Sequence, residues 1–253
     1  MKDNLITTAK QYSELGFSVI PVKKDKSPAL RSWIPFQKKK MTNSEIQSSF
    51  SFSSVDGLGI VCGAVSGNLE VIDVDLKYDK SGTLGKEFKQ LIHDNLPDIF
   101  NKIVVSSTKN MGLHLYFRCE TIAGNQKLAV NSDGEVLVET RGEGGYVIAP
   151  PSPGYRFIYN ELASIPVITD YEREVLFSIA RSFDENDKSE NSSSYYYESD
   201  VFSPFDDYNA RADVPELLKS HGWKKVAEKE DRIYFLRPGK EIKAFYCKLC
   251  VFF

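Results

Sequence analysis

The spacing of apolar residues predicts four helices within the first 183 positions of the chain. Apolar side chains recur every three to four residues in these segments; Leu5, Ala9 and Tyr12, for example, share one face. Gly16 is a typical stop signal after the first helix, and Thr42 or Asn43 is a typical cap before the second. The predicted helices span residues 4–15, 41–50, 85–93 and 171–183.

Shorter apolar runs, bounded by glycine, proline and polar residues, predict strands between these helices. They span residues 17–22, 57–62, 69–75, 103–106, 113–117, 136–139, 146–149 and 155–159. Short turns join three consecutive pairs, so hairpins are expected for 57–62 with 69–75, 103–106 with 113–117, and 136–139 with 146–149. Helices interspersed with hairpins favour an α+β fold with mixed or antiparallel sheets over a doubly wound parallel sheet.

The composition of the chain changes after this region. Residues 184–200 are acidic and rich in serine, which is typical of a linker. A short C-terminal segment, residues 201–253, contains a predicted helix at 215–221 and a predicted strand at 233–236. We therefore expect a main domain at 1–183, a linker at 184–200 and a small C-terminal segment.

Overall composition describes a globular protein without a strongly charged surface. The net charge of the 253 residues is −3, and 42% of them are hydrophobic. This excludes a globally basic protein but not a locally positive groove. No apolar stretch approaches the roughly 20 residues of a membrane span, and no leader is evident. The sequence predicts a soluble, cytoplasmic protein with no membrane partner.

Two carboxylates two residues apart give the first indication of chemistry. Asp73 and Asp75 lie in the apolar run 69–75, and alternation along a strand predicts that both project from one face. Carboxylates held that close repel each other unless a cation or a shared proton neutralises them. Glu139, at the end of another apolar run, would supply a third oxygen ligand for two Mg²⁺ or Mn²⁺ ions. The alternative is that one aspartate caps a turn and the other forms a surface ion pair.

A polar turn and a histidine follow the predicted strand 103–106. The backbone amides of residues 107–112, with Thr108 and Lys109, suit phosphate oxygens, and His114 can donate to a phosphate or carry charge. The alternative for His114 is a half-buried histidine bonded to a neighbour. Arg141 shares a face with Glu139, so it could pair with a phosphate or with Glu139 itself.

Basic and aromatic residues between positions 23 and 33 are candidates for binding single-stranded DNA. A solvated lysine-rich surface is the alternative for the run at 38–40. The candidate DNA contacts are Lys23, Lys24, Lys26, Arg31 and Trp33.

In order along the chain, these segments resemble the N-terminal primase-polymerase domain of replication proteins from plasmids, phages and mobile genetic elements, within the archaeo-eukaryotic primase superfamily. The resemblance spans residues 5–182. Gly112 precedes His114 in a turn where the family usually has Ser-Gly-Gly, and Glu139 stands where the family often has aspartate. The segments that carry the resemblance are Gly16-Phe17-Ser18-Val19-Ile20-Pro21-Val22, Lys26-x-Pro28 with Trp33, Gly59-Ile60-x-x-Gly63, Ser66-Gly67, Val71-Ile72-Asp73-Val74-Asp75, Ser107-Thr108, Gly112-Leu113-His114-Leu115-Tyr116-Phe117 and Glu139-x-Arg141-Gly142-x-Gly144-Gly145-Tyr146-Val147-x-Ala149-Pro150-Pro151-Ser152.

The resemblance implies a primase-like core of mixed sheets flanked by helices, and a DNA primase/DNA polymerase activity. Asp73, Asp75 and Glu139 would hold the metal ions, and His114 would contact the triphosphate. Thr108, Lys109, Gly112 and Arg141 would complete the nucleotide site. Nucleoside triphosphates and a single-stranded DNA template would be the substrates. Residues 205–240 resemble a connector to a helicase domain, which would lie on another polypeptide or have been lost.

Two other classes of function stay open at this stage. One is a catalytically inactive module that binds DNA or recruits a helicase, which would show no metal-dependent nucleotide binding. The other is a different divalent-metal enzyme, such as a nuclease or a sugar-nucleotide transferase. Growth of a product from nucleoside triphosphates on a template separates a polymerase from both.

Overall fold

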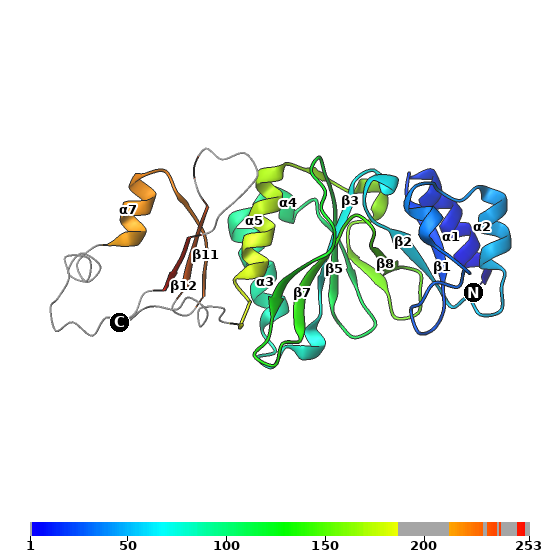
Figure 1. The fold of residues 1–253 in the computed structure, drawn as a ribbon, viewed down its shortest axis with the longest axis horizontal. Helices are drawn as coiled ribbons and strands as arrows, with labels where there is room; N and C mark the ends of the chain where they lie inside the picture. The colour runs from blue at the N-terminus through cyan, green and yellow to red at the C-terminus, as the bar shows by residue number, and fades with distance from the viewer. Residues whose placement is uncertain (1, 187–212, 230–231, 237, 239–246, 251–253) are drawn as a thin grey trace.

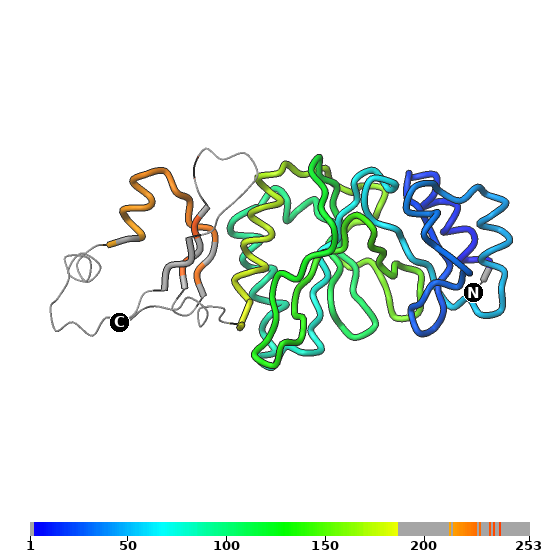
Figure 2. Tube along the Cα trace, in the orientation of Figure 1, coloured from blue at the N-terminus to red at the C-terminus, as the bar shows by residue number. Residues whose placement is uncertain are grey.

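The structure, a computed structural model, describes residues 2–186, 213–229, 232–236, 238 and 247–250. Helices and sheets alternate along the long axis of the molecule. The N-terminal helices are followed along this axis by two sheets and then by a second group of helices (Figures 1 and 2). A third, small sheet lies beyond that group. Both helices and antiparallel sheets are present, so the predicted α+β class is confirmed.

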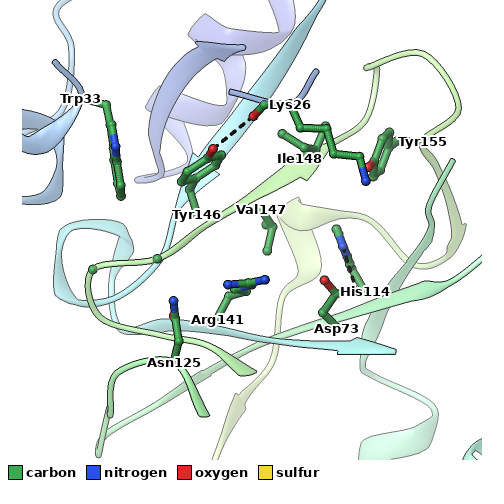
Figure 3. A pocket seen from close by; sticks show the side chains of 12 residues that line it. Lys26, Trp33, Asp73, His114, Asn125, Arg141, Tyr146, Val147, Ile148 and Tyr155 are labelled. Atoms are coloured by element: carbon green, nitrogen blue, oxygen red, sulfur yellow. Dashed lines mark hydrogen bonds and ion pairs between the residues drawn. The ribbon is translucent and has the colours of Figure 1, made fainter. Parts of the chain in front are cut away.

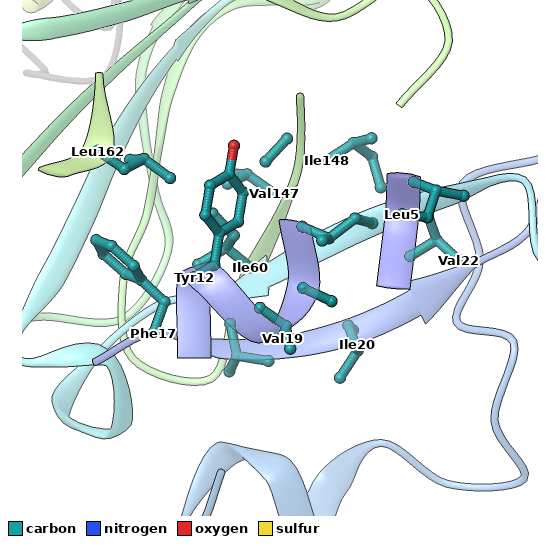
Figure 4. Packing of buried hydrophobic residues seen from close by; sticks show 14 of the residues in the cluster. Leu5, Tyr12, Phe17, Val19, Ile20, Val22, Ile60, Val147, Ile148 and Leu162 are labelled. Atoms are coloured by element: carbon teal, nitrogen blue, oxygen red, sulfur yellow. The ribbon is translucent and has the colours of Figure 1, made fainter. Parts of the chain in front are cut away.

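The N-terminal layer consists of two helices on a three-stranded antiparallel sheet. Helix α1 (Lys2–Glu14) presents its apolar face to this sheet, and α2 (Asn43–Phe50) packs beside it. Thr42 is the cap of α2, and it forms a capping box with Glu45. Figure 4 shows Leu5 and Tyr12 among the strand residues of this core. The strands, in order, are β1 (Ser18–Val22), β2 (Gly57–Val61) and β8 (Tyr146–Ala149).

A larger sheet follows, with a second group of helices on its far face. Its strands are antiparallel except β10 (Val167–Ile168), which runs parallel to β5 (Leu113–Cys119). The helices α3 (Leu84–Asn95), α4 (Pro97–Phe100) and α5 (Asp170–Arg181) supply the second hydrophobic core. The other strands, in order, are β6 (Gln126–Val130), β7 (Val136–Arg141), β3 (Leu69–Val74), β5 (Leu113–Cys119), β4 (Val104–Ser107) and β9 (Arg156–Tyr159).

Strand β3 divides its side chains between the two cores, as a period of two requires. Leu69 and Val71 belong to the core shared with the small sheet, whereas Ile72 and Val74 belong to the core under α3–α5. Asp73 is therefore on the side of the small sheet. The alternation in the sequence thus places this carboxylate between the two sheets.

Two of the three predicted hairpins are wrong. Strand β2 pairs with β1 and β8, whereas β3 pairs with β5 and β7, so residues 57–62 and 69–75 belong to different sheets. The connection contains a 3-10 turn, η2 (Ala64–Ser66), flanked by Gly63 and Gly67 at positive φ, which redirects the chain from one sheet to the other. Strands β7 and β8 are likewise in different sheets. The third hairpin, β4 with β5, is confirmed.

The chain therefore crosses three times between the sheets, after β2, after β7 and after β8. The remaining 3-10 turns are η1 (Ile34–Gln37), η3 (Leu76–Tyr78) and η4 (Leu162–Ser164). The predicted helices and strands of the main domain are present with ends shifted by a few residues, and the apolar pattern missed α4, β6 and β10.

The C-terminal segment forms a helix and a three-stranded antiparallel sheet. Val226 is buried against the second core of the main domain. Of the predicted linker, residues 187–200 lie outside the described part of the chain. The elements are α7 (Val214–Ser220), β11 (Lys224–Lys229), β12 (Arg232–Leu236) and β13 (Cys247–Cys250). Among the described helices, none has the length and apolar character needed to cross a bilayer.

Candidate active site

A pocket of about 350 Å³ opens between the two sheets (Figure 3). The large sheet contributes Asp73, His114 and Arg141, and the loop after β1 contributes Lys26 and Trp33. The remaining lining residues come from the segments around β6, β8 and β9. They are Asn125, Gly144, Gly145, Tyr146, Val147, Ile148 and Tyr155.

The acidic residues and the histidine meet through the register of three neighbouring strands. Asp73 of β3 lies opposite Glu139 of β7 on one side and opposite His114 of β5 on the other. Directly opposed residues in an antiparallel pair have Cβ atoms about 4.5–5.5 Å apart. Segments separated by 25 or more positions in the sequence thus form one row across the sheet, Glu139–Asp73–His114.

Each ring nitrogen of His114 has a polar partner. Its Nε2 lies 3.4 Å from Oδ1 of Asp73, and its Nδ1 lies 3.2 Å from the hydroxyl of Tyr116. The Tyr116 hydroxyl lies 3.0 Å from Ser106 Oγ. The arrangement that satisfies all groups has Ser106 donating to Tyr116, Tyr116 donating to Nδ1, and Nε2–H directed at Asp73. His114 is thus oriented by buried partners, and it presents its Nε2 side to the Asp73 carboxylate in the pocket.

The two carboxylates of the row have pKa values shifted in opposite directions. Burial opposes ionisation of Asp73, but the proximity of His114, and then of Arg141 and Lys26, outweighs it and lowers the pKa of this carboxyl. Burial raises the pKa of Glu139, and the negative charge of Asp73 adds to that effect against the opposing charge of Arg141. A cation beside both groups would relieve their mutual repulsion.

Arg141 forms an ion pair with Glu139 in this structure. Of the two roles left open by the sequence, pairing with a phosphate or pairing with Glu139, the described conformation shows the second. Arg141 also lines the pocket, and a third of its side chain is exposed. The guanidinium is therefore accessible to a ligand while it neutralises Glu139.

Asp75 lies just beyond the end of β3. Its side chain accepts a hydrogen bond from the backbone N–H of Lys77 at 3.0 Å, as a cap of η3. The neighbouring turn is packed tightly against this point: a Cβ on Gly112 would lie 2.5 Å from the carbonyl oxygen of Val74 and 3.0 Å from Thr108 Oγ1. Only glycine allows this approach, so Gly112 places the turn of residues 108–112 beside Asp75.

The basic loop after β1 divides between two pockets. Lys26 and Trp33 line the main pocket, where the Trp33 ring packs edge-on to Tyr146 with centroids 5.0 Å apart. Lys23 and Lys24 line a smaller pocket beside it, together with Lys109. Lys26 and Tyr155 border both pockets. Arg31 lines neither pocket, so the structure separates this predicted DNA contact from the others.

Sequence reasoning did not assign roles to Asn125, Tyr146 and Tyr155. Tyr146 belongs to the glycine-rich motif after Glu139 and could have been found there, whereas Asn125 and Tyr155 carry no local signal. Asn125 Oδ1 accepts a hydrogen bond from the backbone N–H of Gly142 at 3.1 Å, which holds the loop after Arg141. The Tyr155 and His114 rings are 5.9 Å apart.

Within the described residues, no three side chains of histidine, cysteine, aspartate or glutamate come together closely enough to hold a metal ion. Asp73 and Glu139 are opposed, but Glu139 is engaged by Arg141 and Asp75 by Lys77. The donors are nevertheless carboxylate oxygens, the ligands that Mg²⁺ and Mn²⁺ favour. The chemistry of the set therefore fits such ions, and the predicted metal site stays a prediction.

Comparison with known protein families agrees with the features of this site. The N-terminal domain of bifunctional DNA primases/polymerases (Prim-Pol) matches residues 9–168. The match covers more than half of the 253 residues, and the chain belongs to this family. Family membership implies primase/polymerase activity in DNA replication. A search among curated proteins finds no match to the chain.

Proposed function

We propose that the protein is a template-dependent nucleotidyltransferase that makes or extends primers on single-stranded DNA, in replication of a phage, plasmid or mobile element. Residues 1–183 would form the catalytic domain, acting in the cytoplasm. The observation that carries the proposal is the row Glu139–Asp73–His114 beside a pocket that also contains Arg141. Family membership supports the same class of reaction.

Asp73, Asp75 and Glu139 would hold two Mg²⁺ or Mn²⁺ ions. Bound there, the metals would lower the pKa of the attacking hydroxyl and neutralise the leaving pyrophosphate. His114, oriented by Tyr116, would donate its Nε2 proton to an oxygen of the triphosphate in place of Asp73. Arg141 would contribute positive charge on the same side of the pocket. The overall reaction joins the primer 3′-hydroxyl, or the hydroxyl of the first nucleotide, to the α-phosphate with release of pyrophosphate.

Lys23 and Lys24 suit contacts with the template backbone, because they lie beside the main pocket rather than inside it. A separate replicative helicase is the proposed partner, on the resemblance of residues 205–240 to a connector. Most of that segment lies outside the described residues.

The test is incorporation of labelled nucleotides on a primed single-stranded DNA template with Mg²⁺ or Mn²⁺. The wild type is compared with Asp73→Asn/Asp75→Asn and with Asp98→Asn, an exposed aspartate of α4 on the far side of the large sheet. Incorporation by the wild type and by Asp98→Asn, but not by the double variant, supports the proposal. Omitting the primer then separates priming from extension.

Failure of the folded wild type to incorporate nucleotides with either metal would contradict the proposal. Retained DNA binding in that case would favour the inactive, helicase-recruiting module.

A further inference from the structure

Lys26 differs from its basic neighbours in its backbone conformation. It is a non-glycine residue with φ of +71°, in the left-handed region that L-residues rarely adopt. Three hydrogen bonds fix this turn: Lys23 N–H to Ser27 O at 2.8 Å, Lys26 N–H to Lys23 O at 2.9 Å, and the Tyr146 hydroxyl to Lys26 O at 3.1 Å. The last bond ties the turn to strand β8, which lines the pocket.

The side chain of Lys26 extends into the main pocket. Figure 3 shows the ammonium group beside the Tyr155 hydroxyl, with Asp73 and His114 on the other side of the pocket. Lys23 and Lys24 line the smaller pocket, which Lys26 also borders, and neither of them lines the main pocket. Of these three lysines of one loop, only Lys26 therefore reaches the main pocket.

The ammonium group of Lys26 has no fixed anionic partner. It bonds to the neutral phenol of Tyr155, and in the described part of the chain it forms no ion pair with a carboxylate. Arg141, the other strong cation of the pocket, is already paired with Glu139. Lys26 is therefore the pocket cation whose charge is available to a bound anion.

We infer that Lys26 binds the phosphates of the incoming nucleotide from the small sheet, opposite Asp73 and His114, and is not a template contact. The inference rests on the proposed function. A triphosphate is the most anionic part of the substrate, and its α-phosphate must lie at the carboxylate row for reaction to occur. An ammonium group in the same pocket is then placed for the phosphates, while a template strand follows the outer lysines. The pocket volume of about 350 Å³ lies within the usual range for small-molecule sites.

The experiment measures two dissociation constants for each variant: one for a dideoxynucleoside triphosphate with Mn²⁺, and one for single-stranded DNA. Lys26→Ala should weaken triphosphate binding about 10- to 100-fold, the effect of losing a charge-assisted contact. It should leave DNA binding within about twofold of the wild type, and it should reduce the preference for a triphosphate over the corresponding diphosphate.

Two further variants separate this role from a structural one. Lys26→Gly removes the ammonium but suits the positive φ, so it should lose triphosphate binding with no loss of thermal stability. Lys26→Arg should retain most of the affinity because it keeps the charge. Lys89→Ala, on an exposed lysine of α3 at the far face of the large sheet, is the matched control and should bind both ligands as the wild type does.

An unchanged triphosphate constant together with weaker DNA binding in Lys26→Ala would overturn the inference and return Lys26 to the template contacts. Failure of the wild type itself to bind the triphosphate would overturn the proposed function and this inference with it. Nucleotide binding by the wild type with no effect at Lys26 would refute the inference alone.

Discussion

Strand β3 carries two carboxylates that face opposite ways. One is held by a buried ion pair that stabilises the fold, and the other is accessible to a ligand. Glu70 points toward α5, where Arg173 binds it through two hydrogen bonds of 2.5 and 2.9 Å. Its side chain is fully buried. Asp73, three residues later, points between the sheets, has its nearest ionisable partner, Nε2 of His114, at 3.4 Å, and keeps a quarter of its side chain exposed.

The comparison shows what makes a carboxylate available to a ligand. Both oxygens of Glu70 are occupied by a guanidinium that cannot be displaced without unpacking α5. Burial opposes the charge of Arg173, but Glu70 more than offsets that effect and the pKa of Arg173 is raised. Asp73 instead meets its partners at the edge of an open pocket, with a lowered pKa that keeps it ionised. Glu70 therefore stabilises the fold, whereas Asp73 is available to bind a ligand.

The largest expected effect comes from neutralising Asp73. Asp73→Asn should reduce nucleotide incorporation at least about 1000-fold, or about 4 kcal/mol of transition-state stabilisation. The free energy of unfolding should change by less than about 1 kcal/mol, because Asp73 has a single loose contact. Steady-state incorporation and urea unfolding measure the two quantities. A large stability loss would place Asp73 in the same class as Glu70.

Breaking the buried pair should have the opposite profile. Arg173→Met leaves the Glu70 carboxylate buried without a partner, so the free energy of unfolding should fall by about 3–5 kcal/mol. The paired change Glu70→Leu/Arg173→Met should recover most of this loss, because no buried charge is left. Urea unfolding of both variants tests the point, and equal losses in the single and double variants would contradict it.

A smaller effect is expected at the turn beside Asp75. Gly112→Ala would place a methyl group 2.5 Å from the Val74 carbonyl oxygen, so the turn must shift, at a cost of about 1–3 kcal/mol. Incorporation should fall as well, since the same shift moves Asp75. Gly124→Ala is the control for stability, because its nearest atom would be 3.8 Å away. Similar unfolding curves for the two variants would refute the tight packing.

The smallest effect is a dependence of stability on pH. Because folding lowers the pKa of Asp73, its ionised form stabilises the folded state above the ordinary aspartate pKa of about 3.9. That contribution is lost as the pH falls through the lowered pKa. The stability difference between wild type and Asp73→Asn should therefore shrink below about pH 4. Urea unfolding over a pH series would reveal a constant difference if the shift were absent.

The sequence predicted what depends on alternation within one strand and missed what depends on pairing between distant strands. The face of β3 from which Asp73 projects, opposite to that of Ile72 and Val74, followed from the period of two, and the β4–β5 hairpin from its short turn. The separation of β2 from β3 could not be foreseen, because a short glycine-containing connection also suits a hairpin. Nor could the Glu70–Arg173 pair, whose members lie 103 positions apart.

The candidate site shows the same division. Asp73, Glu139, His114 and Arg141 were selected from the local sequence, and the structure brings them to one region. Asn125 and Tyr155 enter the pocket only through the tertiary fold. The ion pair between Arg141 and Glu139 was one of two alternatives that the spacing of these residues left open.

The most direct test of the central claim, that the inter-sheet face of β3 is the reactive one, is a crystal structure with Mn²⁺ and a dideoxynucleoside triphosphate. Diffraction data collected at the manganese edge would locate the ions. The account predicts manganese at the carboxylate of Asp73, Glu139 released from Arg141, and the triphosphate in the pocket. Manganese and nucleotide bound elsewhere, with Glu139 still paired to Arg141, would contradict it.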